Sequence, residues 1–173
     1  MKFLFSVLCC VCLLASVKAQ NTYETLEDSV TGQQMLKGAI NKELLSQNPD
    51  FTWYAESQKI YPVANAEAVE ALKKNKDKIY LIIFGGTWCE DTHFVLPKFF
   101  KIQEAAGFPE DRMVIYAVDR YKKSLSPIAE ALGVFNVPSI IVMQDGKEKG
   151  RVVEYGKTGY WDKELADIIN RQD

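Results

Sequence analysis

One ten-residue stretch decides the fold of this chain: Phe84-Gly85-Gly86-Thr87-Trp88-Cys89-Glu90-Asp91-Thr92-His93. The apolar run over residues 79–84 leads into it and is typical of a strand that is buried on both faces. After it, apolar residues recur at helical spacing, at Val95, Phe99, Ile102 and Ala106. The sequence therefore places Cys89 where a buried strand turns into a helix.

This position favours a reactive thiol over an inert one. The first amides of a helix have no partners within the helix and carry partial positive charge, so they stabilise a nearby thiolate. Most free cysteines are buried core residues that do not react. The neighbours Gly86, Trp88, Glu90 and Asp91 are instead typical of a loop at the surface. We therefore expect Cys89 to be accessible and reactive.

Residues 1–19 have the features of a secretory signal peptide. Lys2 supplies the positive charge, residues 3–15 form a short apolar run, and residues 17–19 offer a cleavage site. The apolar run is shorter than the roughly 20 residues that a membrane-spanning helix needs. We predict an exported protein, periplasmic or extracellular, that begins at Gln20 and has no stable membrane anchor.

Cleavage would leave Cys89 as the single cysteine, since three of the four cysteines lie in the signal peptide. Those three (Cys9, Cys10 and Cys12) could alternatively carry a lipoprotein anchor, but none follows a residue of the small kind that lipidation requires. A lone thiol forms no internal disulfide, and in an oxidising compartment it reacts with other molecules. Its presence in an exported chain therefore suggests a function.

Composition and charge narrow the possible partners. Loss of Lys2 and Lys18 would reduce the basic residues from 21 to 19, against 23 acidic residues, for a net charge of −4. This balance argues against nucleic acid as a partner. The length suits one domain with a proper core, and we expect a monomer.

Periodicity and turn residues predict the remaining elements. Residues 20–31 lack periodicity, and we expect an extended or disordered lead there. We predict helices over 33–46, after Asn65, after Ser126-Pro127 and from Trp161, and strands over 51–60, 113–118, 139–143 and 151–155. The order β-α-β-α-β-α-β-β-α, after one extra helix, predicts an α/β fold with a mixed sheet flanked by helices on both faces.

With Trp88-Cys89 at its central strand-to-helix turn, this order resembles thioredoxin. Members of that family carry Trp-Cys-x-x-Cys, a proline eight residues after the first cysteine, and a cis-proline before the fourth strand. Pro97 lies eight residues after Cys89, and residues 133–139 resemble the segment that leads to the cis-proline, which would be Pro138. The resemblance covers residues 51–173, which we take as a thioredoxin-like domain that follows an N-terminal extension, 20–50, with one helix.

The resemblance implies a substrate groove beside the active sulfur. In the family, the residue before the cis-proline pairs through its backbone with the main chain of the substrate, like an added strand. This assigns Val137 and Pro138 to substrate binding. We expect the ring of Trp88, next to the thiol, to form an apolar lip that docks a partner.

The chain departs from the family at two positions. Thr92 stands where the second cysteine would be, and Ile83 stands where thioredoxins often bury an aspartate. A dithiol reductase needs the second cysteine to resolve its mixed disulfide with substrate. The sequence therefore predicts monothiol chemistry.

The residues next to Cys89 do not decide whether its thiol is activated. The hydroxyl of Thr92, three residues on, could donate to the sulfur and favour the thiolate, or it could cap the helix locally. We expect the only histidine, His93, to be exposed at the surface. One histidine and one cysteine support neither a zinc cluster nor a Cys-His protease, and we predict no metal and no cofactor.

Two classes of function fit these observations. In the first, Cys89 forms mixed disulfides with a protein or a small-thiol partner, and an outside thiol resolves them. In the second, the fold is a non-catalytic binding module in which Cys89 is a relic.

Overall fold

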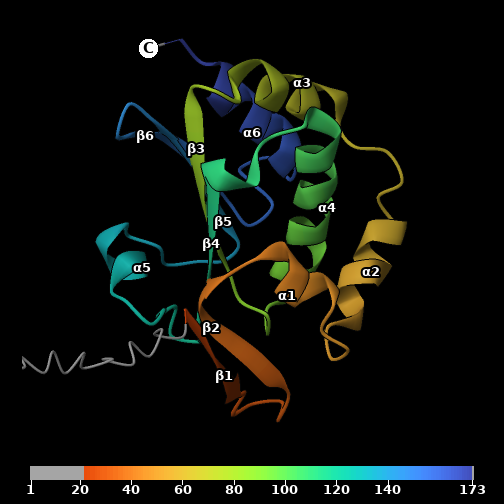
Figure 1. Ribbon diagram of the computed structural model, residues 1–173, viewed down its shortest axis with the longest axis vertical. Helices are drawn as coiled ribbons and strands as arrows, with labels where there is room; N and C mark the ends of the chain where they lie inside the picture. The colour runs from red at the N-terminus through yellow and green to blue at the C-terminus, as the bar shows by residue number, and fades with distance from the viewer. Residues whose placement is uncertain (1–21, 173) are drawn as a thin grey trace, which may run out of the picture.

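The computed structural model describes residues 22–172, which form a mixed sheet with helices on both faces (Figure 1). Six strands make up the sheet: β1 (Tyr23–Glu27), β2 (Gln34–Ile40), β3 (Ile79–Gly85), β4 (Met113–Ala117), β5 (Ser139–Gln144) and β6 (Lys147–Val153). The helices are α1 (Lys42–Ser46), α2 (Thr52–Lys59), α3 (Ala66–Asn75), α4 (Glu90–Ala106), α5 (Ile128–Ala131) and α6 (Trp161–Asn170), with a 3-10 turn at Glu110–Arg112.

The strands lie in the order β1-β2-β4-β3-β5-β6. Strands β3 and β4 are parallel, with Ile83 opposite Ile115, and every other pair is antiparallel. Strand β3 is therefore central, and its carboxyl end meets that of β4 at one edge of the sheet. The loop that carries Cys89 leaves β3 at this edge.

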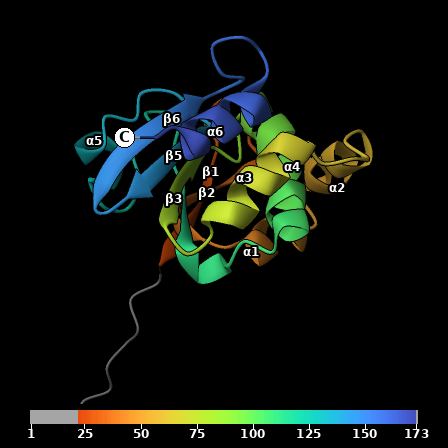
Figure 2. The same ribbon diagram turned by 90° about the horizontal axis from the view of Figure 1, so that it is seen from above.

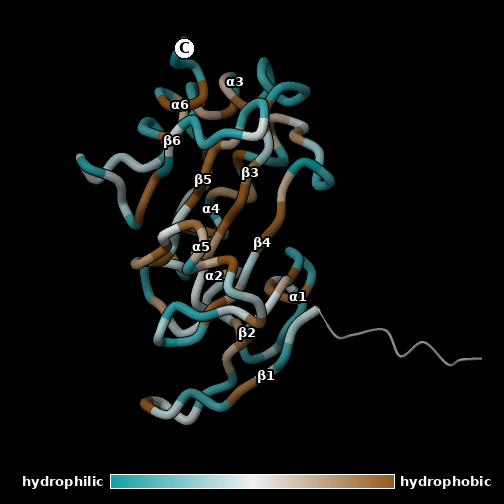
Figure 3. Tube along the Cα trace, turned by 90° about the vertical axis from the view of Figure 1, so that its left-hand side faces the viewer, coloured by the Kyte–Doolittle hydropathy of each residue, from teal (hydrophilic) through white to brown (hydrophobic). Residues whose placement is uncertain are grey.

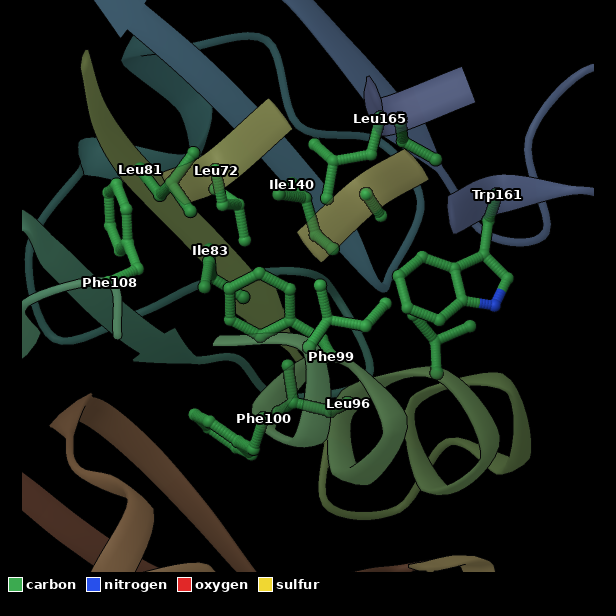
Figure 4. Packing of buried hydrophobic residues seen from close by; sticks show 14 of the residues in the cluster. Leu72, Leu81, Ile83, Leu96, Phe99, Phe100, Phe108, Ile140, Trp161 and Leu165 are labelled. Atoms are coloured by element: carbon green, nitrogen blue, oxygen red, sulfur yellow. The ribbon is translucent and has the colours of Figure 1, made fainter. Parts of the chain in front are cut away.

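The main core lies between the sheet and the helices α2, α3, α4 and α6, which cover one face (Figures 1 and 2). Helix α4 presents Leu96, Phe99 and Phe100 to this core, where Figure 4 shows them below Ile83 of β3. All four side chains are at most 1% exposed. Because these large apolar side chains are almost completely buried, packing in the core fixes the position of α4. It therefore also fixes the start of the helix, next to Cys89.

The opposite face is covered mainly by the single turn of helix α5, and it is only partly buried. Phe84, Val118, Ala129 and Val137 form a smaller core there. Farther along β3 the cover ends, and Tyr80 is 50% exposed. Figure 3 looks onto this face and shows the hydrophobic strands β3, β4 and β5 running past α5. The expectation that residues 79–84 are buried on both faces therefore holds only near the Cys89 end.

The expected helix over 33–46 is wrong for most of its length. Residues Gln34–Ile40 form strand β2, and only Lys42–Ser46 are helical, with the side chain of Asn41 capping them through the Leu44 amide at 3.0 Å. Gly38 has a φ of +118°, which excludes a helix at that position. Pairing with β1 and β4 thus overrides the apolar spacing of Leu36, Ile40 and Leu44.

Two further expectations near the N-terminus are wrong. The strand expected over 51–60 is helix α2, whose buried residues Tyr54 and Ser57 lie three apart and face α4. Its aromatic residues suggested a strand, but the helical spacing of the buried positions decides its structure. Within the lead expected over 20–31, Tyr23–Glu27 form strand β1.

The predicted fold class is confirmed: the protein is α/β, with a mixed sheet, helices on both faces and a helix in its N-terminal part. Residues 23–40 add a hairpin to the same sheet as the remaining strands. The proposed signal peptide, 1–19, lies outside the described residues. Within residues 22–172, no helix is both long and apolar enough to cross a membrane.

Gly38 offers a test of how the hairpin joins the sheet. A Cβ atom at this residue would lie 2.7 Å from the Cα of Tyr23, at a φ that side chains rarely adopt. We expect Gly38→Ala to lower the free energy of unfolding by about 3–5 kcal/mol, measured by urea denaturation.

Gly146 provides the matched control, because its φ is +75° but a Cβ there meets no atom within 4 Å. Gly146→Ala should cost only the backbone strain, about 1–2 kcal/mol. Equal losses in the two variants would contradict the close approach of the hairpin strands.

Candidate functional site

Cys89 is the N-cap residue of α4 and is half-buried. Its amide donates to the carbonyl of Gly86 at 2.9 Å, and its carbonyl accepts from the amide of His93 at 3.0 Å. The side chain does not cap the helix. The sulfur instead points to the segment before β5, where it contacts the carbonyl oxygen of Val137.

The sulfur lies against the segment that the resemblance assigned to substrate binding. The Cys89 Sγ–H donates to the carbonyl oxygen of Val137 at 3.3 Å. The Val137–Pro138 peptide bond is cis, and Pro138 leads directly into β5. The carbonyl of Pro138 accepts from the amide of Glu154 at 2.7 Å. Val137, Pro138 and Cys89 are therefore neighbours in space although 48 residues separate Cys89 from Val137.

The hydroxyl of Thr92 was expected either to donate to the Cys89 sulfur or to cap the helix, and it does neither. Thr92 is 1% exposed, and its Oγ1 accepts from the backbone amide of Gly86 at 3.2 Å. Within residues 22–172 no hydrogen bond joins this hydroxyl to the Cys89 sulfur, nor does it cap the helix. Thr92 thus ties the first turn of α4 back to the loop that precedes Cys89, so it fixes the loop and not the thiol.

Trp88 is half-buried and firmly held. Its Nε1–H donates to the carbonyl of Val118 at 2.8 Å, and its ring packs on the smaller core. Gly86 leaves the space for this ring, because a Cβ there would lie 2.7 Å from it. Trp88 is therefore a fixed wall on one side of Cys89.

Two cations lie over the Trp88 ring, the guanidinium of Arg120 at 4.9 Å and the ammonium of Lys122 at 5.5 Å from the centroid. Arg120 also makes a bidentate ion pair with Asp28, through Nε to Oδ1 at 2.5 Å and Nη2 to Oδ2 at 2.6 Å. This contact holds the pKa of Asp28 below its usual range. The flank of the site next to Trp88 is thus built by charged residues from the hairpin turn and the β4–α5 loop.

His93 is half-buried, so the expectation of an exposed surface histidine is wrong. Its ring stacks on Trp53 of α2 at 4.2 Å, and its Nε2–H donates to the carbonyl of Thr87 at 2.7 Å. Burial lowers the pKa of His93, although the bond to Thr87 and the charge of Glu90 partly oppose this shift. His93 therefore supports the loop from the side of α2.

The other flank of the site carries an aromatic pair. Tyr155, just after β6, lies edge-on to Phe94 of α4 at 5.3 Å. Burial and interaction with the carboxylate of Asp91 raise the pKa of Tyr155 to about 12. The phenol is therefore neutral at ordinary pH, and it lies beside the acidic first turn of α4.

The structure thus brings Trp88, Cys89, Val137 and Pro138 together at one edge of the sheet, with Thr92 beneath the loop. Sequence reasoning missed Arg120 and Asp28. The sequence could have indicated Arg120, because it lies just beyond β4. The parallel strands β3 and β4 end at the same edge of the sheet, so residues that follow them lie close together. Asp28 gave no such signal. Among residues 22–172, no cluster of three or more His, Cys, Asp or Glu side chains could hold a metal ion.

Comparisons with known proteins place part of the chain near thioredoxins. No family model matches the chain. Thioredoxin H2-2 from Oryza sativa subsp. japonica is 34% identical over 83 residues, which are 48% of this chain. The matched part spans 58% of the length of that relative. The chain is therefore similar to a thioredoxin over about half of its own length.

Solved structures with a similar arrangement include two plainly distant proteins. A protein of unknown function from Pseudomonas aeruginosa aligns with a TM-score of 0.46 at 16% identity, over 68% of this chain and 80% of that one. Thioredoxin O2 from Arabidopsis thaliana aligns with a TM-score of 0.34 at 24% identity, over 52% of this chain and 76% of that one.

The burial of His93 predicts a pH-dependent stability. Its pKa is lowered from 6.5 in the folded chain, so below that pH the unfolded chain binds a proton that the folded chain does not. The free energy of unfolding should therefore fall as the pH drops below about 6.5, by at most about 1.4 kcal/mol per pH unit from this residue. His93→Gln should flatten the curve between pH 7.5 and 5.

Urea denaturation at several pH values measures this effect in both proteins. The comparison is between slopes, because the substitution also changes the stack on Trp53. Parallel curves for the two proteins over this range would show that His93 titrates as it does in water.

Proposed function

We propose that this protein carries out thiol-disulfide exchange through the single thiol of Cys89. The observation that carries the proposal is the position of the sulfur, half-exposed at the start of α4 and 3.3 Å from the carbonyl before a cis-proline. The similarity to a thioredoxin supports the same general chemistry.

The proposed exchange proceeds in two steps that balance. The Cys89 thiolate attacks one sulfur of a substrate disulfide, forms a mixed disulfide and releases the other sulfur as a thiolate. A thiolate from outside then attacks the substrate sulfur, restores the Cys89 thiolate and leaves with the substrate as a new disulfide. Cys89 is the only cysteine within residues 22–172, so no internal thiol in this part can carry out the second step.

The backbone around Val137 suits an extended substrate chain. This segment lies between β5 and the Cys89 loop, and its last carbonyl before Pro138 faces the sulfur. An extended peptide that pairs here would bring its own sulfur next to Cys89. Trp88 and the cis-proline would form the two walls of this groove, which is the binding role proposed for Trp88, Val137 and Pro138.

We also propose that the exchange takes place outside the cytoplasm, because residues 1–19 have signal-peptide features. The proposed partners are proteins or small thiols and disulfides, which an exported monomer would meet in an oxidising compartment.

Replacement of Cys89 tests the proposal in a full-length chain whose Cys9, Cys10 and Cys12 are changed to serine. Incubated with oxidised glutathione, this background protein should gain one glutathionyl group, which excess dithiothreitol removes. Cys89→Ser should abolish the gain, as seen by intact mass spectrometry. A folded background protein that forms no adduct would favour the alternative, a binding module with a relic cysteine.

A second substitution tests the placement of the site. In the same background, Thr92→Cys should create a dithiol that reduces insulin disulfides in the presence of dithiothreitol, because Cys89 is the N-cap of α4 and position 92 lies in the first turn of that helix. The turbidity of precipitating insulin gives the rate. Correctly folded Thr92→Cys protein without a rate above the background would count against the placement.

A further inference from the structure

The N-terminal hairpin reaches the Cys89 site through three separate contacts. The amide of Leu36 donates to Oγ1 of Thr87 at 3.0 Å, and both residues are buried. The ammonium of Lys37 lies 3.0 Å from the carboxylate of Asp119, just after β4. Farthest out, Asp28 holds Arg120 in the bidentate pair described above.

The Asp28–Arg120 pair is built as a fixed clamp. Asp28 is 1% exposed, and its carboxylate also accepts from the amide of Val30 at 3.2 Å and the hydroxyl of Thr31 at 2.6 Å. These bonds hold the carboxylate in place independently of the arginine. A guanidinium that meets a carboxylate through two parallel bonds has a fixed plane, unlike a lysine ammonium.

The clamp aims the guanidinium at the Cys89 site. Arg120 lies 4.9 Å from the centre of the Trp88 ring, and Trp88 is the residue before Cys89. The hydrogen bonds to Asp28 use Nε and Nη2 and not Nη1, and the side chain is 31% exposed. Hydrogen bonding to Asp28 is the main cause that raises the pKa of Arg120, and the negative charge of the Cys89 thiolate is a further one.

We propose that Arg120, clamped by Asp28, is a positioning residue that fixes the Trp88 ring and sets a positive charge beside the Cys89 thiolate. The two residues lie 92 apart in the sequence, so the hairpin contributes to the site from outside the expected thioredoxin-like part. The inference rests on the proposed function, since it gives the charge a role in reactions of the thiol. Glu90 and Asp91, in the first turn of α4, are negatively charged, whereas Arg120 is positively charged. The electrostatic potential around Cys89 is therefore more positive on the side of Trp88 than on the side of α4.

Two alkylating reagents of different charge test this role. Iodoacetate is an anion and iodoacetamide is neutral, so the ratio of their rates at Cys89 reports the local potential. The rates are read by mass spectrometry on the Cys89 peptide, in the full-length serine background. Arg120→Gln should lower the iodoacetate-to-iodoacetamide ratio roughly three- to tenfold, the effect of one charge several ångströms away in a partly hydrated site.

Further variants separate charge from structure. Arg120→Lys keeps the charge and should restore most of the ratio. The matched control is Lys123→Gln, an exposed lysine of the same loop, which removes one charge and should leave the ratio nearly unchanged. In about 1 M salt, where charges are screened beyond roughly 3 Å, the difference between Arg120→Gln and the background should shrink.

Asp28→Ala tests the clamp itself. The substitution removes a negative charge, so charge counting alone predicts a higher ratio. The clamp predicts a lower ratio, because the freed arginine leaves the Trp88 ring.

Three results would overturn the inference: an unchanged ratio in Arg120→Gln, an equal loss in Lys123→Gln, or a higher ratio in Asp28→Ala. None of these depends on disulfide exchange. The glutathione experiment on the background protein can thus fail while the alkylation ratios still change, and the reverse also holds, so the two proposals are judged separately.

Discussion

The hydrogen bonds around the loop from Gly86 to Cys89 are the constraint on which the site depends. Thr92 accepts from the amide of Gly86, the hydroxyl of Thr87 accepts from β2, and the carbonyl of Thr87 accepts from His93. The ring of Trp88 donates to the carbonyl of Val118 after β4. A loop at the end of a buried strand must find partners for its polar groups, and these come from β2, α4 and the end of β4.

This arrangement explains how a half-exposed sulfur can have a defined position. The core fixes β3 and α4, since Ile83 and Phe99 are both fully buried, and the loop between them has little freedom left. The sulfur then faces the carbonyl of Val137, whose own position follows from the start of β5. The thiol and the Val137 carbonyl are thus held in place by different strands of one sheet, β3 and β5.

Sequence reasoning succeeded where structure is set by local pattern and failed where distant contacts decide it. The strand and helix on either side of Cys89 are confirmed because the strand is a continuous apolar run and the helix carries a long apolar period. The helix expected over residues 34–40 was wrong because pairing with β1 and β4 makes them a strand. The local sequence pattern contains no sign of that pairing. The Asp28–Arg120 pair could not be predicted either, since it joins a turn to a loop 92 residues away.

Thr92 has a structural role at the position where a dithiol site would carry its second cysteine. In a dithiol site this position would carry a sulfur, which accepts hydrogen bonds only weakly. Here a buried hydroxyl at that position satisfies the amide of Gly86, directly before the loop that presents Cys89. An amide left without this acceptor would cost about 1–3 kcal/mol. The threonine therefore does more than occupy the place of a missing cysteine. It stabilises the loop conformation that presents Cys89.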